Sequence, residues 1–367
     1  MLKNKNKGIT LVALVITIII LLFLAGISIS ALTNTGIFGK AKEAKQKSAD
    51  AELDQNTKLD SYEEEISNYL QPDVKQAIKK GKPLSTDKNT EIEDEKGNKI
   101  VIPAGFKVTG DATTVDKGIV IEDATSGATA GSQFVWVPVG KITKADGTKT
   151  EIKLNRYTFA SNGTPTEKNE EVIDSYFSET ASKGNTVAKD ITNFKNSVKT
   201  NGGYYIGRYE ARKNETSGKL TEVNSDSVWN NITQPNAATQ ARNMYDEQQP
   251  FTSDLMNSYA WDTAALFLQS CGTNSNYSRQ PNLIDLLAQT GTNNLTDITK
   301  IDKQCNVFDM ASNVREWTTE TSSLNNFPCT NRGGYYGSDN YTTNRYHNDE
   351  LLMNDIIGFR PILYINV

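Results

Sequence analysis

The sequence is poor in the side chains that build most metal sites and nucleophilic sites. It contains one histidine and three cysteines in 367 residues. The single histidine, His347, excludes a multi-histidine zinc site and leaves only one candidate base for a Ser/His/Asp triad. None of the cysteines stands in a CxxC pair, so a structural zinc site is not expected. Cys271, Cys305 and Cys329 allow at most one internal disulfide, and the sequence does not identify its pair.

The chain also lacks a basic surface pattern. Lysine and arginine number 39 against 44 aspartate and glutamate, which gives a net charge of −5. Binding to nucleic acid needs a basic stripe, so we expect no nucleic-acid partner. Charge is absent altogether from residues 9–32, whereas the rest of the chain is polar and rich in Asn, Thr, Ser and Tyr.

The uncharged run from Ile9 to Leu32 is long enough to cross a hydrocarbon core of about 30 Å as a helix. Lys3, Lys5 and Lys7 precede the run and no lysine follows closely, which places the start in the cytoplasm and the bulk outside. A cleaved secretory signal is the alternative, but its apolar region would be shorter. We therefore predict a single-pass protein of the cell membrane with an extracellular C-terminal domain.

The start of this run resembles the prepilin cleavage site of type IV pilins and pseudopilins. Basic residues are followed by Gly8, Ile9, Thr10 and Leu11 in the order typical of that family. The resemblance implies that prepilin peptidase cuts between Gly8 and Ile9, that the new N-terminus is methylated, and that other pilin-like subunits are partners. The glutamate usual early in the mature helix falls on Ala13 here. This departure favours a minor pilus component or a simple anchor over a major fibre subunit.

A stalk and a linker are predicted beyond the apolar run. A turn is expected at Asn34-Thr35-Gly36, and apolar residues recur at helical spacing from Leu59 to Tyr69, before Pro72. This stripe suits a stalk lying on its own domain or a packing surface for other pilins. The predicted division is a leader at 1–8, a transmembrane helix at 9–33, a stalk helix at 34–71, a linker at 72–91 and a globular domain at 92–367.

The globular part alternates short strand patterns with helical ones. Strands are predicted at 91–95, 99–102, 132–139, 203–210 and 361–367. Helical patterns occupy 191–198 and 258–270, while the polar residues 141–190 are interpreted as an insertion between core elements. Mixed elements of this kind indicate an α+β fold class.

Several segments, in order, resemble the formylglycine-generating enzyme superfamily, also called the sulfatase-modifying-factor family. They are Phe134–Val139 (FVWVPV), Tyr204–Glu210 (YYIGRYE), Tyr259–Ala264 (YAWDTA), Asn306–Trp317 (NVFDMASNVREW), Asn331–Gly334 (NRGG) and Gly358–Arg360 (GFR). The resemblance covers about residues 92–367 and implies a domain of C-type lectin type behind the transmembrane and stalk helix. A shared fold does not by itself fix the function.

Cysteine content separates the functional alternatives. The active enzymes of this family hold copper with a cysteine pair shortly after an Arg-Gly-Gly motif. Here the motif is Arg332-Gly333-Gly334, and the chain from Tyr335 to Val367 contains no cysteine. We therefore expect no copper and no catalytic thiol oxidation. An enzyme using the same fold remains one alternative, and a structural pseudopilin of a secretion or pilus system is another.

The segment between Gly334 and Gly358 has the composition of an antibody-like paratope, dense in Tyr, Asn, Ser, Thr and Asp. A polar loop with inward-packed tyrosines is the alternative. In folds of this kind the region lies on the exposed binding face, so we predict an adhesin or receptor surface for an extracellular glycan or protein. The predicted contact residues are Tyr335, Tyr336, Asp339, Asn340, Tyr341, Asn344, Tyr346, His347, Asn348 and Asp349. Resemblance to retroelement-diversified proteins of this fold adds the hypothesis that residues 335–357 are diversified through asparagine codons.

The segment from Asp309 to Glu316 matches the stretch through which this family often binds calcium. The resemblance implies carboxylate ligands from Asp309 and Glu316 and backbone carbonyl ligands from Ser312 and Val314, a mixed oxygen set that calcium accepts. The usual glycine of the family is Ser312 here. The alternative is that the two carboxylates only bond nearby turns.

Overall fold

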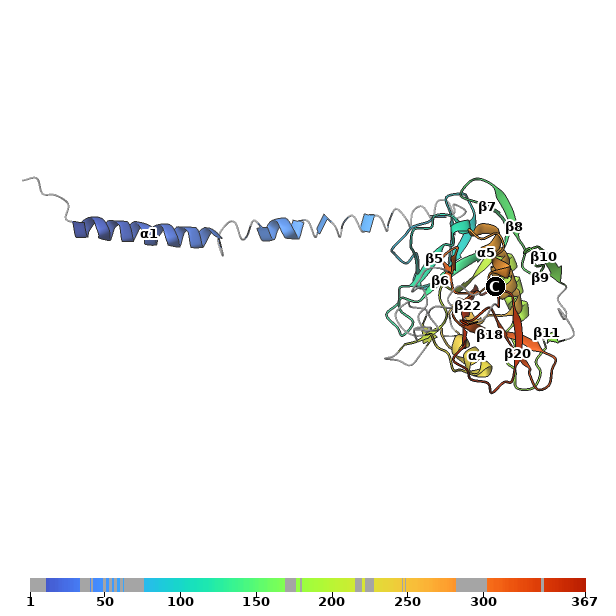
Figure 1. The fold of residues 1–367 in the computed structure, drawn as a ribbon. Coiled ribbons are helices and arrows are strands. Elements are labelled where there is room, and N and C mark those ends of the chain that lie inside the picture. The colour runs from blue at the N-terminus through green and yellow to red at the C-terminus, as the bar shows by residue number, and fades with distance from the viewer. Residues whose placement is uncertain are drawn as a thin grey trace, which may run out of the picture. The chain divides into compact units, whose positions relative to one another are not determined.

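The computed structural model describes residues 11–33, 40, 42–48, 51–52, 55, 58–59, 62, 76–168, 176–178, 180–214, 220–221, 228–245, 247, 249–281, 302–337 and 340–367 (Figure 1). The chain divides into two compact units, Met1–Val74 and Lys75–Val367.

The first unit contains helix α1 (Leu11–Thr33), whose 23 residues include no charged side chain. Its described apolar side chains are exposed, up to 70% for Phe23. Within the described residues, which give the side chains of α1 only over 14–25, no helix is long and apolar enough to cross a membrane. The cleavage site at Gly8 and Ile9 lies outside the described residues, as does most of the predicted stalk, although residues 42–48 are helical.

The second unit is built on a six-stranded sheet in which all neighbouring strands are antiparallel. In spatial order its strands are β15 (Phe251–Leu255), β22 (Pro361–Ile365), β12 (Gly203–Gly207), β6 (Gln133–Pro138), β5 (Val120–Asp123) and β4 (Phe106–Thr109). The central strands β6, β12 and β22 are almost wholly buried, since helices α3 (Ile191–Asn201) and α5 (Ser258–Cys271) pack on this sheet. Burial on both faces explains their continuous apolar sequences.

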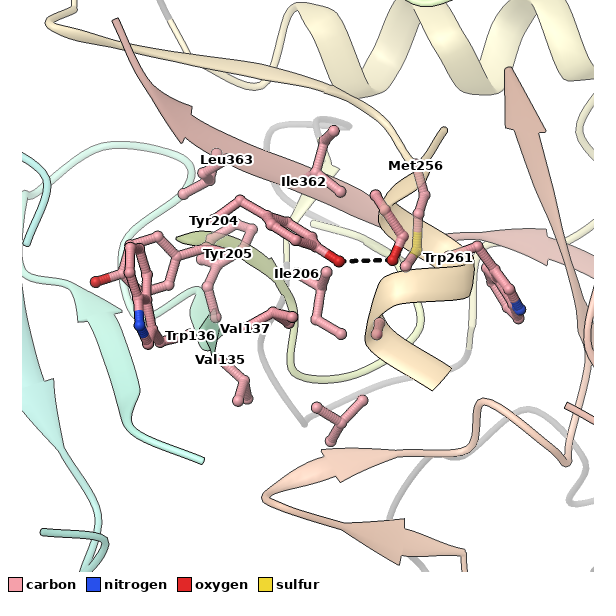
Figure 2. Packing of buried hydrophobic residues seen from close by; sticks show 14 of the residues in the cluster. Val135, Trp136, Val137, Tyr204, Tyr205, Ile206, Met256, Trp261, Ile362 and Leu363 are labelled. Atoms are coloured by element: carbon pink, nitrogen blue, oxygen red, sulfur yellow. Dashed lines mark hydrogen bonds between the residues drawn. The ribbon is translucent and has the colours of Figure 1, made fainter. Parts of the chain in front are cut away.

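Aromatic side chains join the sheet to α5. The hydroxyl of Tyr204 donates to the backbone carbonyl of Ala260 at 2.6 Å (Figure 2). On the same strand, Tyr205 pairs across to Trp136 of β6, with ring centroids 4.9 Å apart. Cross-strand aromatic pairs of this type stabilise sheets. Trp261 of α5 donates to the backbone carbonyl of Thr342 at 2.9 Å, which ties the C-terminal part of the chain to this helix.

A second, five-stranded sheet carries the C-terminal segment. Its path is β11 (Phe177–Ser178), β18 (Arg315–Ser322), β19 (Cys329–Arg332) and β20 (Arg345–Asn348), and β21 (Ile357–Phe359) pairs in parallel with β18. Among the described strands, β20 pairs with β19 alone and so forms an edge. Helix α4 (Gln234–Arg242) packs against β15 and β18.

Smaller elements complete the unit. They are β1 (Gln76–Ala77), β2 (Thr90–Glu93), β3 (Lys99–Ile102), β7 (Gly140–Thr143), β8 (Lys149–Ile152), β9 (Arg156–Phe159), β10 (Pro165–Lys168), β13 (Arg212–Lys213), β14 (Leu220–Thr221), β16 (Lys303–Gln304), β17 (Val307–Phe308) and the 3-10 helices η1 (Val115–Lys117) and η2 (Tyr277–Arg279).

The mixed α+β architecture agrees with the predicted class, and the strand at 99–102 is β3. Two boundaries differ. Residues 76–91, expected as linker, contribute β1, which pairs with β2, and Lys80 and Pro83 bridge to β4. The compact unit therefore begins before residue 92. Residues 141–190, expected as an insertion, contain the hairpins β7–β8 and β9–β10, whose short polar strands give only a weak alternating signal.

Candidate functional site

Two glycines and an arginine fix the start of the segment predicted to bind ligand. Gly333 has φ of +86°, and a Cβ there would lie 2.8 Å from the carbonyl oxygen of Met310. A Cβ on Gly334 would overlap the carbonyl oxygen of Ala311. Only glycine tolerates such close backbone approach. Arg332 is fully buried and donates from Nε to the carbonyl of Asn344 at 3.1 Å.

The end of the segment is fixed by Arg360, which is also fully buried. Its guanidinium bonds both carboxylate oxygens of Glu316, at 2.6 and 3.1 Å, and donates to the carbonyls of Gly207 and Phe308 at 2.8 and 2.9 Å. The two arginines therefore bind backbone carbonyls, and the segment between them starts and ends on rigid structure.

A buried charge cluster lies beneath the segment. Arg156, Arg332 and Arg345 surround Asp262 and Glu320, with N–O distances from 2.5 to 2.9 Å. Burial alone would raise the pKa of Glu320, but the three guanidiniums outweigh it and lower that pKa to about 2. Arg345 belongs to the predicted variable segment, yet its side chain is only 10% exposed and is committed to this cluster.

The pleat of β20 divides the predicted contact residues between two faces. Successive side chains of a strand point to opposite sides of the sheet. Arg345 and His347 thus share one side, whereas Tyr346 and Asn348 share the other. The register against β19 places Tyr346 beside Asn331 and His347 beside Thr330. The predicted contact residues within β20 therefore lie on two different faces of the strand.

The side of Tyr346 holds a stack of aromatic rings around a guanidinium. Arg315, the first residue of β18, lies over the ring of Tyr346 at 3.6 Å and over that of Tyr335 at 4.3 Å. Tyr336 meets Tyr335 edge-on, with centroids 6.1 Å apart. Desolvation lowers the pKa of Arg315, and Tyr346 opposes that effect. Cation–π contacts of this kind hold both rings and cation in place.

Hydrogen bonds extend this stack toward Tyr341. Asn344 donates to the hydroxyl of Tyr346 at 2.7 Å and to the side-chain oxygen of Asn340 at 3.0 Å. A second guanidinium, that of Arg279, lies 3.6 Å from the ring centre of Tyr341. The backbone N–H of Asn344 donates to the carbonyl of Tyr341 at 2.9 Å, which joins the two groups, and we call the whole set the Arg315 face. It comprises Arg279, Arg315, Tyr335, Tyr336, Asn340, Tyr341, Asn344 and Tyr346, all of which are partly exposed.

The opposite side of β20 carries an aromatic cluster around His347. Tyr176 stacks on the imidazole with centroids 6.0 Å apart, and Phe177 and Phe327 meet it edge-on at 6.0 and 5.9 Å. Tyr176 and Phe327 are nearly half exposed, at 48% and 46%. We call these four residues the His347 cluster. It lies on the other side of the strand from the Arg315 face.

The remaining predicted residues take different positions. Asn348 pairs across the sheet with Cys329, and Asp349 accepts from the backbone N–H of Leu351 at 2.8 Å in a turn. Asp339 lies outside the described residues. Sequence reasoning missed Arg279 and Arg315, because both lie outside the segment that composition marked. The sequence did offer one signal for Arg315, because it directly precedes the buried Glu316 in a strand and its side chain therefore points to the opposite face.

The four residues predicted to bind calcium make other contacts in the structure. Glu316 uses both carboxylate oxygens for Arg360. The backbone N–H of Val314 donates to Glu210 at 3.1 Å. Ser312 is fully buried, and Asp309 adopts φ of 60°. In the described part of the chain, no group of three or more His, Cys, Asp or Glu side chains is arranged to hold a metal ion. Calcium binding through these four residues stays a prediction.

The three cysteines lie outside the Arg315 face. Burial raises the pKa of Cys271 and of Cys329 to about 12, and it raises that of Cys305 as well. Since the thiolate is the reactive form, these thiols are poor nucleophiles in the folded protein.

A separate cavity of about 360 Å³ opens at the β4 edge of the six-stranded sheet. Phe106, Tyr245 and Phe251 line it, and their ring centroids lie 5.2 to 5.7 Å apart. Its carboxylate, Asp123, accepts from the side chains of Thr129 and Tyr245 and from a backbone N–H. These contacts give the cavity wall a structural role.

No family model matches the chain, and no curated protein matches it. Among solved structures, the chain is similar to Treponema denticola variable protein 1, with 12% identity over 70% of this chain and 98% of that one, at a TM-score of 0.28. A TM-score this low does not establish a common fold.

Proposed function

We propose that this chain is a surface-displayed ligand-binding protein, held at the membrane by a pilin-like N-terminal helix and contacting its ligand through the Arg315 face. The observation that carries the proposal is this face itself. Three tyrosines and a side-chain amide belong to a segment whose two ends are buried and fixed. Stacking and hydrogen bonds hold them together with the guanidinium of Arg315 from β18.

Aromatic and arginine side chains held in this way are the residue types that dominate binding energy at interfaces. Their order before binding matters, because a side chain that is already fixed loses less conformational entropy when a ligand arrives. The buried Arg332 and Arg360 supply that rigidity from below. The domain that presents the face is proposed to be of C-type lectin type.

The anchor belongs to the same proposal. Exposed apolar side chains along α1 support a helix that lies in lipid or packs against other pilin-like subunits. Prepilin peptidase would then cut after Gly8. Mass analysis of the mature protein should find a methylated N-terminus at Ile9, whereas a start near Ser30 would indicate an ordinary signal peptidase.

Retroelement diversification of residues 335–357 fits only some positions of the segment. Thr342 and Thr343 are buried and bond the carbonyls of Tyr277 and Ser278, at 2.7 and 2.8 Å. Arg345 is held in the charge cluster. We propose that variation is confined to the partly exposed residues between these fixed points. A near-copy of the codons for 331–360 beside a reverse transcriptase gene would support this.

An enzyme on the same fold and a structural pseudopilin are the competing functions. An array of printed glycans and cell-surface proteins, probed with the full-length chain in detergent, distinguishes ligand binding from these two functions. The triple variant Tyr336→Ala/Tyr341→Ala/Tyr346→Ala should lose the spots that the wild type binds and keep a similar melting temperature. The matched control, Phe327→Ala/His347→Ala, should keep them. Spots retained by the triple variant, or no spots for the wild type, would contradict the proposal.

A further inference from the structure

Arg315 differs from four other enclosed arginines of the domain. Arg156, Arg332, Arg345 and Arg360 each bond a buried carboxylate. Within the part of the chain that the structure describes, Arg315 forms no ion pair, and its Nε is enclosed without a hydrogen-bond partner. Its neighbours are the rings of Tyr335 and Tyr346.

Arg279 repeats the pattern at the other end of the face. Its guanidinium lies 3.6 Å from the ring centre of Tyr341, and among the described residues no aspartate or glutamate forms an ion pair with it. The Arg315 face thus presents two guanidiniums and, among its described members, no carboxylate. A protein of net charge −5 has concentrated unpaired positive charge on the surface proposed to meet its ligand.

A partly desolvated cation without a counter-charge is costly, and ring faces compensate for only part of that cost. An oxyanion would complete the site, because the guanidinium fork matches the paired oxygens of carboxylate, sulfate or phosphate. Asn344 already bonds Asn340 and Tyr346, so it orients the neighbouring donors of the face.

We propose that the Arg315 face binds an oxyanion group of the ligand, with Arg315 as the principal cation and Arg279 as the second. The inference rests on the proposed function, which makes this face the contact surface, and adds the chemical class that the face selects. Neutral ligands of similar shape would bind weakly, because they leave the two guanidiniums without a counter-charge.

Arginine footprinting of the full-length protein in detergent tests this directly. Phenylglyoxal modification of each arginine is followed by mass spectrometry in sodium acetate, sodium sulfate or sodium methyl phosphate, against sodium chloride at equal ionic strength. An anion present at twice its Kd leaves about one third of the sites free, so modification of Arg315 and Arg279 should slow about threefold. The internal control is Arg208, which stacks on Tyr209 and bonds Gln133 elsewhere in the domain.

Two variants make the result specific. Arg315→Met should abolish the protection of Arg279 by the effective anion, whereas Arg208→Met should leave it intact. Arg315→Met should also melt no lower than the wild type in chloride, because it removes an unpaired cation. Equal rates at Arg315 in all four salts, or equal protection at Arg208, would overturn the inference. Such a failure leaves the tyrosine-variant array result standing, so the two proposals fail separately.

Discussion

Arg345 donates from Nε to Oε1 of Glu320 at 2.9 Å, from the middle of a segment whose composition marks it as a contact surface. The next residue along the strand, Tyr346, instead points to the Arg315 face. One strand therefore serves both purposes, since alternate side chains hold the segment to the domain and present it outward.

Glu320 is the residue on which this attachment depends most. Glu320→Gln would leave Asp262 as the one carboxylate of the cluster and would remove the ion pair between Glu320 and Arg156, and breaking a buried pair in this way costs about 3–5 kcal/mol. We expect a loss of that order in the free energy of unfolding, measured by urea denaturation with tryptophan fluorescence. Glu247→Gln, in an exposed pair with Lys189, is the matched control and should leave the midpoint unchanged. Equal effects of the two substitutions would contradict the cluster's role.

Glu210 should make stability fall as pH rises. Burial, together with Asp309 and Glu316, raises the pKa of Glu210 well above its ordinary value. The folded protein then keeps a proton that the unfolded chain releases above that ordinary value, so folding weakens as pH rises toward the raised pKa. Glu210→Gln cannot lose this proton, and it should flatten the slope between pH 5 and 8 by up to about 1.4 kcal/mol per pH unit. Urea midpoints at four pH values measure the slope, and identical slopes would refute the assignment.

The native thiols should resist alkylation. A rise in the pKa of Cys271 and Cys329 from 9.0 to about 12 leaves about a thousandth as much thiolate at pH 8. Iodoacetamide should therefore label neither cysteine in the folded protein and both in urea, as seen by peptide mass spectrometry. Rapid native labelling of Cys329 would show that the thiol nearest the Arg-Gly-Gly motif is reactive, and would reopen the enzyme alternative.

The Arg-Gly-Gly and Gly-Phe-Arg motifs marked the two ends of the site's segment in the sequence. In the structure, Gly333 and Gly334 occupy backbone positions that exclude a side chain, and Arg332 and Arg360 bind backbone carbonyls. These roles depend on residue type and on immediate neighbours, which a single sequence displays. The mixed α+β class followed equally from strand and helix patterns.

The composition of the face was harder to predict. Tyr346 and His347 are adjacent aromatic residues, and only the strand β20 that contains both shows that they lie on different faces. Arg279 and Arg315 join the face from distant parts of the chain through long-range packing. The linker predicted at 72–91 overlaps the compact unit for a similar reason. Its strand β1 is stabilised by pairing with β2, and this pairing exists only in the folded sheet.

Comparing Tyr346→Ala with His347→Ala tests the central claim most directly, because the two residues are neighbours in sequence and lie on opposite faces of β20. On any array ligand bound by the full-length wild type, Tyr346→Ala should weaken binding by about 2 kcal/mol, close to thirtyfold in Kd, as expected for an aromatic hot spot of an interface. His347→Ala should bind as the wild type does. Loss of binding in His347→Ala with Tyr346→Ala unaffected would place the contact surface on the His347 cluster and contradict the account.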